Sequence, residues 1–499
     1  MTGQGWLDAG ESVLAVVLTI FALAGAVPAV IMGFQFLLVP VHGFVNHYRR
    51  AAPTTPRVAV IVPAWNEGAV IGASIDRLMA LEYPDGHLRI YVVDDASTDD
   101  TPDVVRAKER QYPGSVFHLR RERGGEGKAH TLNHGIRHVL SEDWMEAMLI
   151  MDADVIYLPD SLRKMTRHFA DPKVGAVTAY IREGSAEKNF LNRFIGFEYV
   201  LSQLGSRRAQ NVLGAMACLA GGAQLHTRHN IEQLGGAIDT SSLAEDTVTT
   251  FETQLAGRRV VFEPYAVVLA EEPHRVGALW KQRLRWARGN VQLTARFRKL
   301  WFRPARGHRL GSISFGLTWF GVFLLPVFMI LASIGLIGLY LMQSPISGVI
   351  FRSMWIVIGC AYIYTITLAV QLDPGMARAA WREVLVFPGL VSIVVMLSAF
   401  FPGLFTELVP ALFGLRMSEG GIFAWYLAIY AWISLCMVGA WGAKRLDDAR
   451  VPQWIVALYV YLVGYGPILC AVTFDAYVKE ARGAAMVWDK TEKTGRVMG

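Results

Sequence analysis

Long uncharged runs of apolar residues constrain this chain more than any other feature. The first run, residues 13–41, contains no charged side chain and is long enough to cross a membrane as a helix. Five more apolar runs follow in the second half, at about 311–341, 350–371, 384–416, 421–442 and 453–473. Hydrophobic residues make up 53% of the 499 residues and charged residues 18%, whereas about 25% charged residues is usual in a soluble protein. We therefore expect a helical membrane domain formed by both ends of the chain.

The charges around the first run predict its orientation. Asp8 and Glu11 precede it, and Arg49 and Arg50 follow it. A secretory signal would instead have a basic start and a shorter apolar core. By the positive-inside rule, the N-terminus lies outside and the following residues lie inside. We interpret residues 1–48 as an N-terminal transmembrane anchor.

The remaining charges and the cysteines exclude several classes of protein. The net charge is +6, and the basic residues gather beside the apolar runs, as in the cytoplasmic loops of membrane proteins. This distribution does not indicate a nucleic-acid partner. The four cysteines include no CxxC pair, so the sequence predicts neither a zinc site nor a disulfide framework.

The segment 49–273 has a different pattern, because charges return and short apolar runs alternate with amphipathic stretches. Helical patterns at Gly68–Leu81 and Thr101–Arg110 separate runs that read as buried strands. These runs are RVAVIVPAWNE, LRIYVVDDAS, AMLIMDADV and VGAVTAY. The alternation predicts an α/β domain with a mostly parallel sheet, in which ligands bind beyond the carboxyl ends of the strands.

The next segments return to the membrane. Residues 274–308 mix Trp and Phe with Arg and Lys at near-helical spacing, which is typical of helices lying in the membrane interface; a solvated surface helix is the alternative. We expect residues 309–475 to be transmembrane helices. Within them, 384–416 contains three prolines and Glu407, so we expect a re-entrant, interfacial or hairpin segment there. Residues 476–499 form a terminal tail.

Two pairs of aspartates follow predicted strands. Asp94 and Asp95 end YVVDD, where a carboxylate can accept hydrogen bonds from a base or ribose. A helix N-cap is the alternative for this loop. Asp152 and Asp154 end AMLIMDAD, where they could share a divalent cation with a diphosphate, although such pairs also occur in surface loops.

Three further motifs carry polar groups suited to group transfer. Glu245 and Asp246 could supply a general base, or could be acids favoured at a helix N-terminus, and spacing alone does not decide. The glycine-rich stretch 124–136 could approach a ligand closely, with Lys128 reaching a phosphate, or could be a flexible loop before a helix.

The third motif is QRLRW in the basic segment. Gln282 and Trp286 are one helical turn apart, with Arg285 beside Trp286. An arginine can pair with a diphosphate, and an indole can stack on a sugar ring. The alternative is an interfacial anchor belt that also includes Trp280 and Trp301.

Taken in this order, the motifs resemble the processive glycosyltransferases of family 2. This family includes cellulose, chitin, hyaluronan and poly-N-acetylglucosamine synthases. Its pattern is an aspartate pair after the second strand, a DxD, an E-D and a QxxRW, and PAWNE at Pro63–Glu67 resembles its P-A-Y-N-E opening. The resemblance covers about residues 57–306. It implies a Rossmann-like cytoplasmic domain of the GT-A type, inserted in an α-helical transmembrane domain with interfacial helices.

The resemblance also implies roles for individual residues. The donor nucleotide would be bound by Pro63, Trp65, Glu67, Asp94, Asp95, Lys128 and Asp152. Asp154, with Asp152, would hold Mg²⁺ or Mn²⁺. Asp246, beside Glu245, would be the catalytic base. The diphosphate and the acceptor end of the glycan would be held by Gln282, Arg285 and Trp286. One departure is Ala244, where many members have Thr.

The end of the chain, VWDKTEKTGRV, also resembles a motif of related synthases. Trp488, Thr491 and Lys493 fit W-x-x-T-x-K, which lies in a cytoplasmic gating loop over the nucleotide sugar. This interpretation requires the segment 384–416 to return to the side from which it came. The alternative is a basic tail attracted to anionic lipid.

These observations lead to a functional hypothesis. We expect a metal-dependent, inverting, processive hexosyltransferase of the bacterial inner membrane, which uses UDP-glucose or UDP-N-acetylglucosamine and extrudes a β-linked polysaccharide through its own helices. Its partners would be the UDP-sugar, the growing polysaccharide and the lipid bilayer, with an accessory subunit or homo-oligomer left open. Aromatic residues in these helices could stack on sugars, although each taken singly is more often an interfacial or packing residue: Trp355, Tyr362, Trp425, Tyr459 and Tyr461. The alternative is a non-processive enzyme that glycosylates a lipid.

Overall fold

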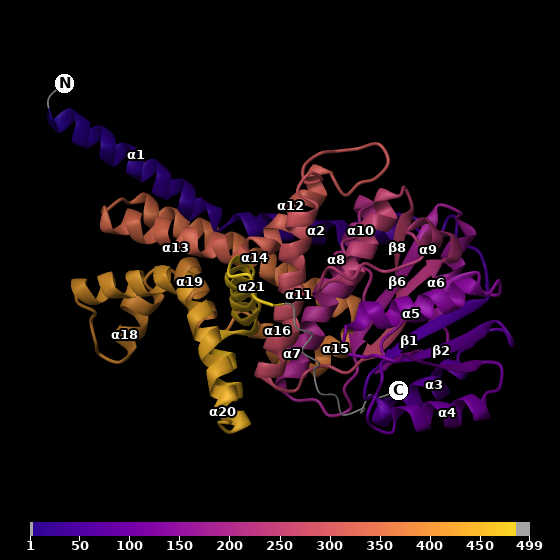
Figure 1. The fold of residues 1–499 in the computed structure, drawn as a ribbon. Coiled ribbons are helices and arrows are strands. Elements are labelled where there is room, and N and C mark those ends of the chain that lie inside the picture. Colours follow the sequence, from indigo (N-terminus) through magenta and orange to yellow (C-terminus); the bar gives the residue numbers. More distant parts are fainter. Residues whose placement is uncertain (1–2, 486–499) are drawn as a thin grey trace. The chain divides into compact units, whose positions relative to one another are not determined.

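The computed structural model describes residues 3–485, and it divides into two compact units. The helical unit contains the residues up to Gln35, Arg275–Leu284 and Leu317–Val478. The α/β unit contains Phe36–His274, Arg285–Gly316 and the residues from Lys479 onward. Figure 1 shows the elements of both units along the chain.

The α/β unit is built on an eight-stranded sheet with the order β3-β2-β1-β4-β7-β6-β8-β5. Its strands are β1 (Val58–Ala64), β2 (Leu88–Asp94), β3 (Val116–Arg120), β4 (Ala147–Ile150), β5 (Val155–Tyr157), β6 (Val174–Glu183), β7 (Gln224–Thr227) and β8 (Arg259–Ala270). The pairings show that β5 and β7 run against the other six strands. The sheet is thus mixed, with most of its strands parallel.

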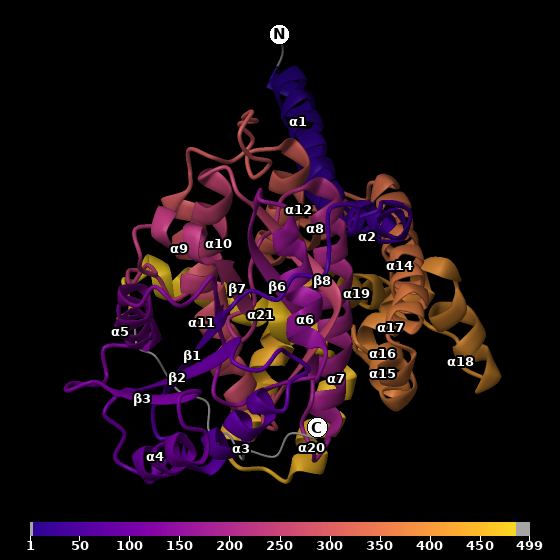
Figure 2. The same cartoon turned by 90° about the vertical axis from the view of Figure 1, so that its right-hand side faces the viewer.

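The first three parallel pairings determine where polar loops gather. Almost all of β1 is buried, as expected for an apolar, β-branched strand covered on both faces. It pairs in parallel with β2 on one side and β4 on the other. The carboxyl ends of these strands therefore share one edge of the sheet. Figure 2 shows β1, β2 and β3 side by side.

Helices cover the sheet on both faces. Side chains from α5 and α9 pack on β1, β2 and β4 in a buried cluster that includes Ile61, Tyr91, Leu132 and Ile231. The helices of this unit are α3 (Gly68–Met79), α4 (Thr101–Gln111), α5 (Lys128–Ser141), α6 (Ser161–Thr166), η1 (Arg167–Ala170), α7 (Phe190–Tyr199), η2 (Val200–Gly205), α8 (Ser206–Leu213), α9 (Arg228–Gln233) and α10 (Glu245–Leu255). The predicted helices at 68–81 and 101–110 correspond to α3 and α4.

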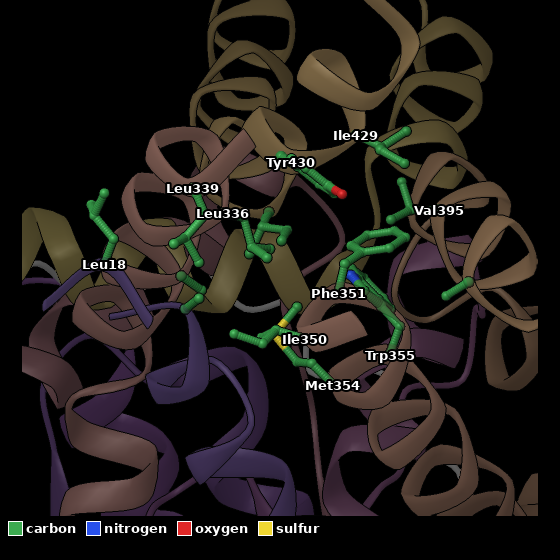
Figure 3. Close-up of a cluster of buried hydrophobic side chains, with 14 residues drawn as sticks. Leu18, Leu336, Leu339, Ile350, Phe351, Met354, Trp355, Val395, Ile429 and Tyr430 are labelled. Atoms are coloured by element: carbon green, nitrogen blue, oxygen red, sulfur yellow. The ribbon is translucent and has the colours of Figure 1, made fainter. Parts of the chain in front are cut away.

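The helical unit has its own apolar core. Figure 3 shows this core, in which Leu18, Leu336, Phe351, Trp355 and Tyr430 come together from helices far apart in sequence. The helices are α1 (Gly3–Ala24), α2 (Val27–Phe44), α12 (Ile313–Phe323), α13 (Leu325–Leu341), α14 (Ile346–Leu372), α15 (Pro374–Ala379), α16 (Trp381–Leu385), α17 (Leu390–Phe400), η3 (Leu404–Leu408), α18 (Val409–Leu412), α19 (Glu419–Asp448), α20 (Gln453–Val463) and α21 (Tyr465–Ala481). The ends of α2, α12 and α21 extend into the α/β unit.

Small residues bring two of these helices together. A Cβ atom on Gly335 of α13 would lie 2.3 Å from the backbone nitrogen of Ala22 in α1. Such close backbone approach is typical of helix packing in membranes.

Length and composition identify several candidate membrane spans among the described residues. Gly10–Phe44, Ile346–Leu372 and Glu419–Asp448 are each long and apolar enough to cross a membrane. Three bent helix pairs would bring the number of spans to six. One of them, Leu390–Phe400 with Leu404–Leu412, bends by 101° in the proline-rich run expected to be irregular. The runs at 311–341 and 453–473 are also broken, with bends of 69° and 88°.

Two sets of aromatic residues are packed within the protein. Trp280 and Trp301, considered as members of an interfacial belt, are both buried, and their indole N–H groups donate to Asp475 and to the carbonyl of Thr294. Trp355, considered both as a sugar-stacking and as a packing residue, belongs to the helical core shown in Figure 3.

Candidate active site

Loops from distant parts of the chain meet at the carboxyl edge of β4. Asp152 lies two residues after Ile150, the last residue of β4. The reversed strand β7 begins at Gln224, which pairs with Ile150. Since β7 runs the other way, the residues before it, Gly221 and Gly222, arrive at the edge that β4 leaves. A Cβ atom on Gly222 would lie 3.5 Å from Oδ2 of Asp152.

A lysine and three carboxylates form a cluster at this edge. Lys128, the first residue of α5, places its Nζ 2.5 Å from Oδ1 of Asp152 and 3.8 Å from Oε1 of Glu245. A Cβ atom on Gly221 would lie 3.3 Å from Lys128 Nζ and 3.4 Å from Oδ2 of Asp246. The structure thus brings together three of the motifs singled out in the sequence. We call Lys128, Asp152, Glu245 and Asp246 the edge cluster.

Glu245 and Asp246 occupy the first turn of α10, where the helix dipole favours negative charge. Oδ1 of Asp246 accepts from the backbone N–H of Thr247 at 2.7 Å. Burial and the neighbouring Asp246 carboxylate raise the pKa of Glu245, while Lys128 and Arg285 oppose that rise. The pKa of the Lys128 ammonium lies above its usual value. Burial alone would lower this pKa, but the carboxylates of Asp152 and Glu245 raise it by more.

Asp94 and Asp95 are both buried and serve the loops around them. Asp94 accepts from the backbone N–H of Ser97 at 2.8 Å and from Arg120 at 2.9 Å. Burial opposes its ionisation, but hydrogen bonds from His118 and Ser97 and the charge of Arg120 hold the pKa of Asp94 below its usual value. Asp94 thus organises the turn that follows β2.

Asp95 fastens the glycine-rich loop beside it. Its carboxylate pairs with Arg121 and accepts from the backbone N–H of Gly125 at 3.0 Å. A Cβ atom on Gly124 would lie 2.1 Å from the Asp95 carbonyl oxygen, so only glycine fits there. The glycine-rich pattern predicts that these glycines let the backbone approach a ligand. The approach that the structure shows is to the Asp95 backbone.

The PAWNE segment is tied to the same loop. Asn66 has a positive φ of 53°, which asparagine tolerates well. Its side-chain oxygen accepts from the N–H of Thr98, and its own N–H donates to the Ser97 hydroxyl. The N–H of Glu67 donates to the hydroxyl of Thr101 at 2.8 Å. These bonds hold Trp65, which is 38% exposed, at the surface after Pro63, the sixth residue of β1.

The predicted metal ligands differ in their surroundings. Asp152 keeps 37% of its side chain exposed and faces Lys128, whereas Asp154 is buried. Ala153 between them is fixed by the Ser74 hydroxyl, which donates to its carbonyl at 2.5 Å. Within residues 3–485 there is no group of three or more His, Cys, Asp or Glu side chains placed to hold a metal ion. Two carboxylates from the protein would suit Mg²⁺ or Mn²⁺ that takes its other ligands from water and phosphate.

The QxxRW residues lie on α11 (Val276–Arg296). Gln282 belongs to the part of this helix in the helical unit, and its Oε1 accepts from Arg283 at 2.8 Å. Arg285 and Trp286 belong to the α/β unit, where the charge of Arg285 acts on Glu245. Trp286 is 36% exposed. The motif residues Trp488, Thr491 and Lys493 lie outside the described residues.

Several residues around the cluster were missed in the sequence. Cys218 lies beside Asp246, with its thiol donating to the Leu219 carbonyl and accepting from the Thr247 hydroxyl at 3.2 Å. Burial and the Asp246 charge raise the pKa of this thiol well above its usual value. The Gly221–Gly222 pair, in LAGGAQ, was a visible signal next to a strand. No sequence signal marked Cys218, because its neighbours Asp246 and Thr247 come from another part of the chain.

Comparisons with known proteins agree with this architecture. A family profile described as "Glycosyltransferase like family 2" matches residues 56–289. The probable glycosyltransferase YdaM of Bacillus subtilis is 31% identical over 266 residues, which cover 52% of this chain and 61% of that protein. The poly-beta-1,6-N-acetyl-D-glucosamine synthase of Staphylococcus aureus is 30% identical over 241 residues, covering 48% and 56%. The beta-monoglucosyldiacylglycerol synthase of Synechocystis is 30% identical over 237 residues, covering 48% of each chain.

A solved glycosyltransferase structure shares this fold. The mannosyltransferase PcManGT from Pyrobaculum calidifontis, solved with GDP-Man and Mn²⁺, superposes with a TM-score of 0.54 at 24% identity. The match covers 74% of this chain and 99% of that one. This likeness supports the GT-A-like fold of the mixed sheet.

The sequence matches are confined to one part of each protein. They span about half to three-fifths of the length of the curated relatives named above. Within this chain they fall on the segment that carries the α/β sheet and the edge cluster. The predicted resemblance is confirmed for that segment: residues 56–289 match the family described as glycosyltransferase-like family 2.

Proposed function

We propose that this chain is a membrane-embedded, inverting glycosyltransferase that extends a β-linked polysaccharide from UDP-glucose or UDP-N-acetylglucosamine. The observation that carries this proposal is the edge cluster, in which Lys128 meets Asp152, Glu245 and Asp246 at the carboxyl edge of the sheet. The candidate membrane spans and the relative named as a poly-N-acetylglucosamine synthase support it.

The reaction that we propose uses Asp246 as the base. Its carboxylate accepts the proton of the acceptor hydroxyl, whose oxygen then bonds to the anomeric carbon of the donor. The bond from that carbon to the diphosphate oxygen breaks, and UDP leaves with the electron pair. Attack on the face opposite the leaving group inverts the anomeric centre. Lys128 and Arg285 are cations near this site that can offset the charge of the diphosphate.

The carboxylates of the Asp152–Asp154 motif are donors that suit a hard divalent cation. Beside them, Glu245 is approached by the cations Lys128 and Arg285, and Asp246 by the cation Arg207. We assign Asp152 and Asp154 as the ligands of Mg²⁺ or Mn²⁺. When bound, such an ion would stabilise the negative charge that develops on the departing diphosphate.

The helical unit supplies the membrane part of the proposal. We infer that its apolar helices anchor the enzyme in a bacterial inner membrane, with the α/β unit in the cytoplasm, and that they guide the polymer outward. The relative that supports this inference is named as a poly-beta-1,6-N-acetyl-D-glucosamine synthase. The terminal W-x-x-T-x-K motif remains our prediction for a gating segment.

Product analysis tests the proposal directly. The purified full chain is assayed for nucleotide release with a panel of UDP-sugars and GDP-mannose, with Mg²⁺ or Mn²⁺ and after treatment with a chelator. We expect turnover with one UDP-sugar, a requirement for the metal, and a product of many sugar units. Absence of transfer from every donor, or unchanged turnover in Asp246→Asn, would contradict the proposal.

A second candidate function is the glycosylation of a lipid. The similarity to a beta-monoglucosyldiacylglycerol synthase favours it. The same assay separates the two functions when diacylglycerol vesicles are added. A labelled product that carries one sugar and extracts into organic solvent would establish this second function instead of the first.

A further inference from the structure

The segment 479–485, at the end of the described chain, is held against α11 by one buried arginine. Nε of Arg288 donates to Oε1 of Glu480 at 2.5 Å. Its two terminal nitrogens donate to the backbone carbonyls of Ala484 at 2.6 Å and Ala485 at 3.0 Å. A guanidinium that satisfies a carboxylate and two carbonyls fixes both a side chain and the backbone after it. All of these residues belong to the α/β unit.

One turn further along α11, Gln292 connects this segment to the acidic pair. Its Nε2 donates to both oxygens of Glu480, each at 3.3 Å. Its Oε1 accepts from the backbone N–H of Leu243 at 3.2 Å. The Gln292 amide therefore binds the terminal segment through its nitrogen and the loop that leads into Glu245 and Asp246 through its oxygen.

Close packing supports the same connection. A Cβ atom on Gly289 would lie 2.6 Å from the Ala244 Cβ and 3.1 Å from the Ala244 nitrogen. The loop and α11 thus touch without room for another methyl group. Because Ala244 immediately precedes Glu245, a shift of the loop against α11 moves the acidic pair with it.

We propose that Glu480 is a positioning residue, which sets the place of Glu245 and Asp246 through Gln292. This inference rests on the proposed function, because it assumes that the acidic pair serves catalysis. Displacing a catalytic group by a fraction of an ångström slows a reaction in which geometry supplies part of the rate. The terminal segment therefore controls turnover through the position of the acidic pair.

Variants at positions 292 and 480, first one and then both together, test this connection. Gln292→Glu keeps the acceptor for Leu243, removes the donor to Glu480 and places two carboxylates together. We expect kcat to fall roughly tenfold, the effect of losing one or two hydrogen bonds, with the donor KM unchanged. The double variant Gln292→Glu/Glu480→Gln restores an amide facing a carboxylate with the polarity reversed, and we expect kcat to return to within about threefold of wild type.

Hydrogen–deuterium exchange of the full chain gives a readout independent of activity. Peptides covering 241–247 should exchange faster in Gln292→Glu and return toward wild type in the double variant. Glu480→Gln, a milder change, should shift exchange and kcat in the same direction by less. The matched control is Glu232→Gln, which alters another Arg–Glu pair of this unit, with Arg228 Nε at 2.7 Å.

The outcomes separate this inference from the proposed function. Wild-type kcat and exchange in both single variants would overturn the positioning role, as would a folded double variant that recovers neither. A decrease in thermal stability alone, with kcat unchanged, would also overturn it. If the wild-type chain transfers no sugar from any donor, the proposed function fails, and the exchange of peptides 241–247 alone then decides whether Glu480 positions the loop.

Discussion

Two clusters of charged side chains in the α/β unit show how the same residue types serve different ends. In the first, Glu263 of β8 is fully buried and accepts from Arg167 at 2.5 Å, His168 at 2.8 Å and the backbone N–H of Tyr265 at 2.9 Å. Burial opposes its ionisation, yet His168 and Arg167 hold the pKa of Glu263 below its usual value. Every charge in this closed cluster has a partner.

The edge cluster differs in where it lies and in the direction of the pKa shift. Burial and the Asp246 carboxylate raise the pKa of Glu245, whereas the pKa of Glu263 is lowered. Lys128 lies near both Asp152 and Glu245 at the carboxyl edge of the sheet, where ligands bind in α/β folds. A raised carboxyl pKa beside other charged groups at this edge, more than residue type, therefore distinguishes the candidate site from a structural cluster.

The largest effect should follow from removing the proposed base. We expect Asp246→Asn to lower kcat by roughly 10²–10⁴-fold, because a positioned general base contributes about that much. The melting temperature of the purified chain should stay near that of wild type. Nucleotide release measured with saturating donor checks the rate. Turnover at the wild-type level would assign the base to another residue.

Breaking the closed cluster should instead affect folding. Glu263→Gln leaves Arg167 and His168 without a carboxylate, and we expect it to lower the free energy of unfolding by about 3 kcal/mol. Thermal unfolding in detergent checks this, while kcat per folded molecule should not change. A loss of kcat at unchanged stability would place Glu263 in the candidate active site, and the two clusters would then not differ in role.

The same cluster predicts a dependence on pH. Since the folded pKa of Glu263 is depressed, its contribution to stability is present above the unfolded value of about 4.3 and is lost as the pH falls through the lower folded pKa. The wild-type chain should therefore lose stability in acid more steeply than Glu263→Gln. Parallel stability curves for the two proteins would contradict this expectation.

Lys128 gives a smaller effect with a definite sign. Its charge lowers the pKa of Glu245, so Lys128→Met should raise that pKa further and decrease the ionised fraction at a given pH. If ionised Glu245 supports turnover, the acidic limb of the kcat profile should move to higher pH by about 1 unit. Lys128→Arg retains the charge and serves as the control. A shift of the acidic limb to lower pH would contradict the assigned effect of Lys128 on the pKa of Glu245.

The smallest effect belongs to a pair at the surface. Arg228 and Glu232 lie one turn apart on α9, with nearly half of the Glu232 side chain exposed. We expect Glu232→Gln to change the free energy of unfolding by no more than about 0.5 kcal/mol and to leave kcat unchanged. A cost comparable to that of Glu263→Gln would show that exposure does not separate these pairs.

Local patterns predicted much of the α/β unit. The helices at 68–81 and 101–110 and the strand that precedes Asp94 agree with the structure, because apolar periodicity and turn residues act over a few neighbouring positions. The sequence patterns did not predict the direction of every strand. The reversal of β7 depends on how the chain enters the sheet after α8, and no local signal in QLHT reports that path.

The same distinction applies to the candidate site. Sequence alone determined that Asp94–Asp95 and Asp152 follow strands, because hydrophobic periods indicate where strands end, whereas it left a helix N-terminus as one of two readings for Glu245–Asp246. Only the tertiary structure decided that Asp94 and Asp95 pair with Arg120 and Arg121, while Lys128 lies near both Asp152 and Glu245. It also brought Gln292 between Glu480 and Leu243, since contacts between distant segments follow from the path of the chain through space.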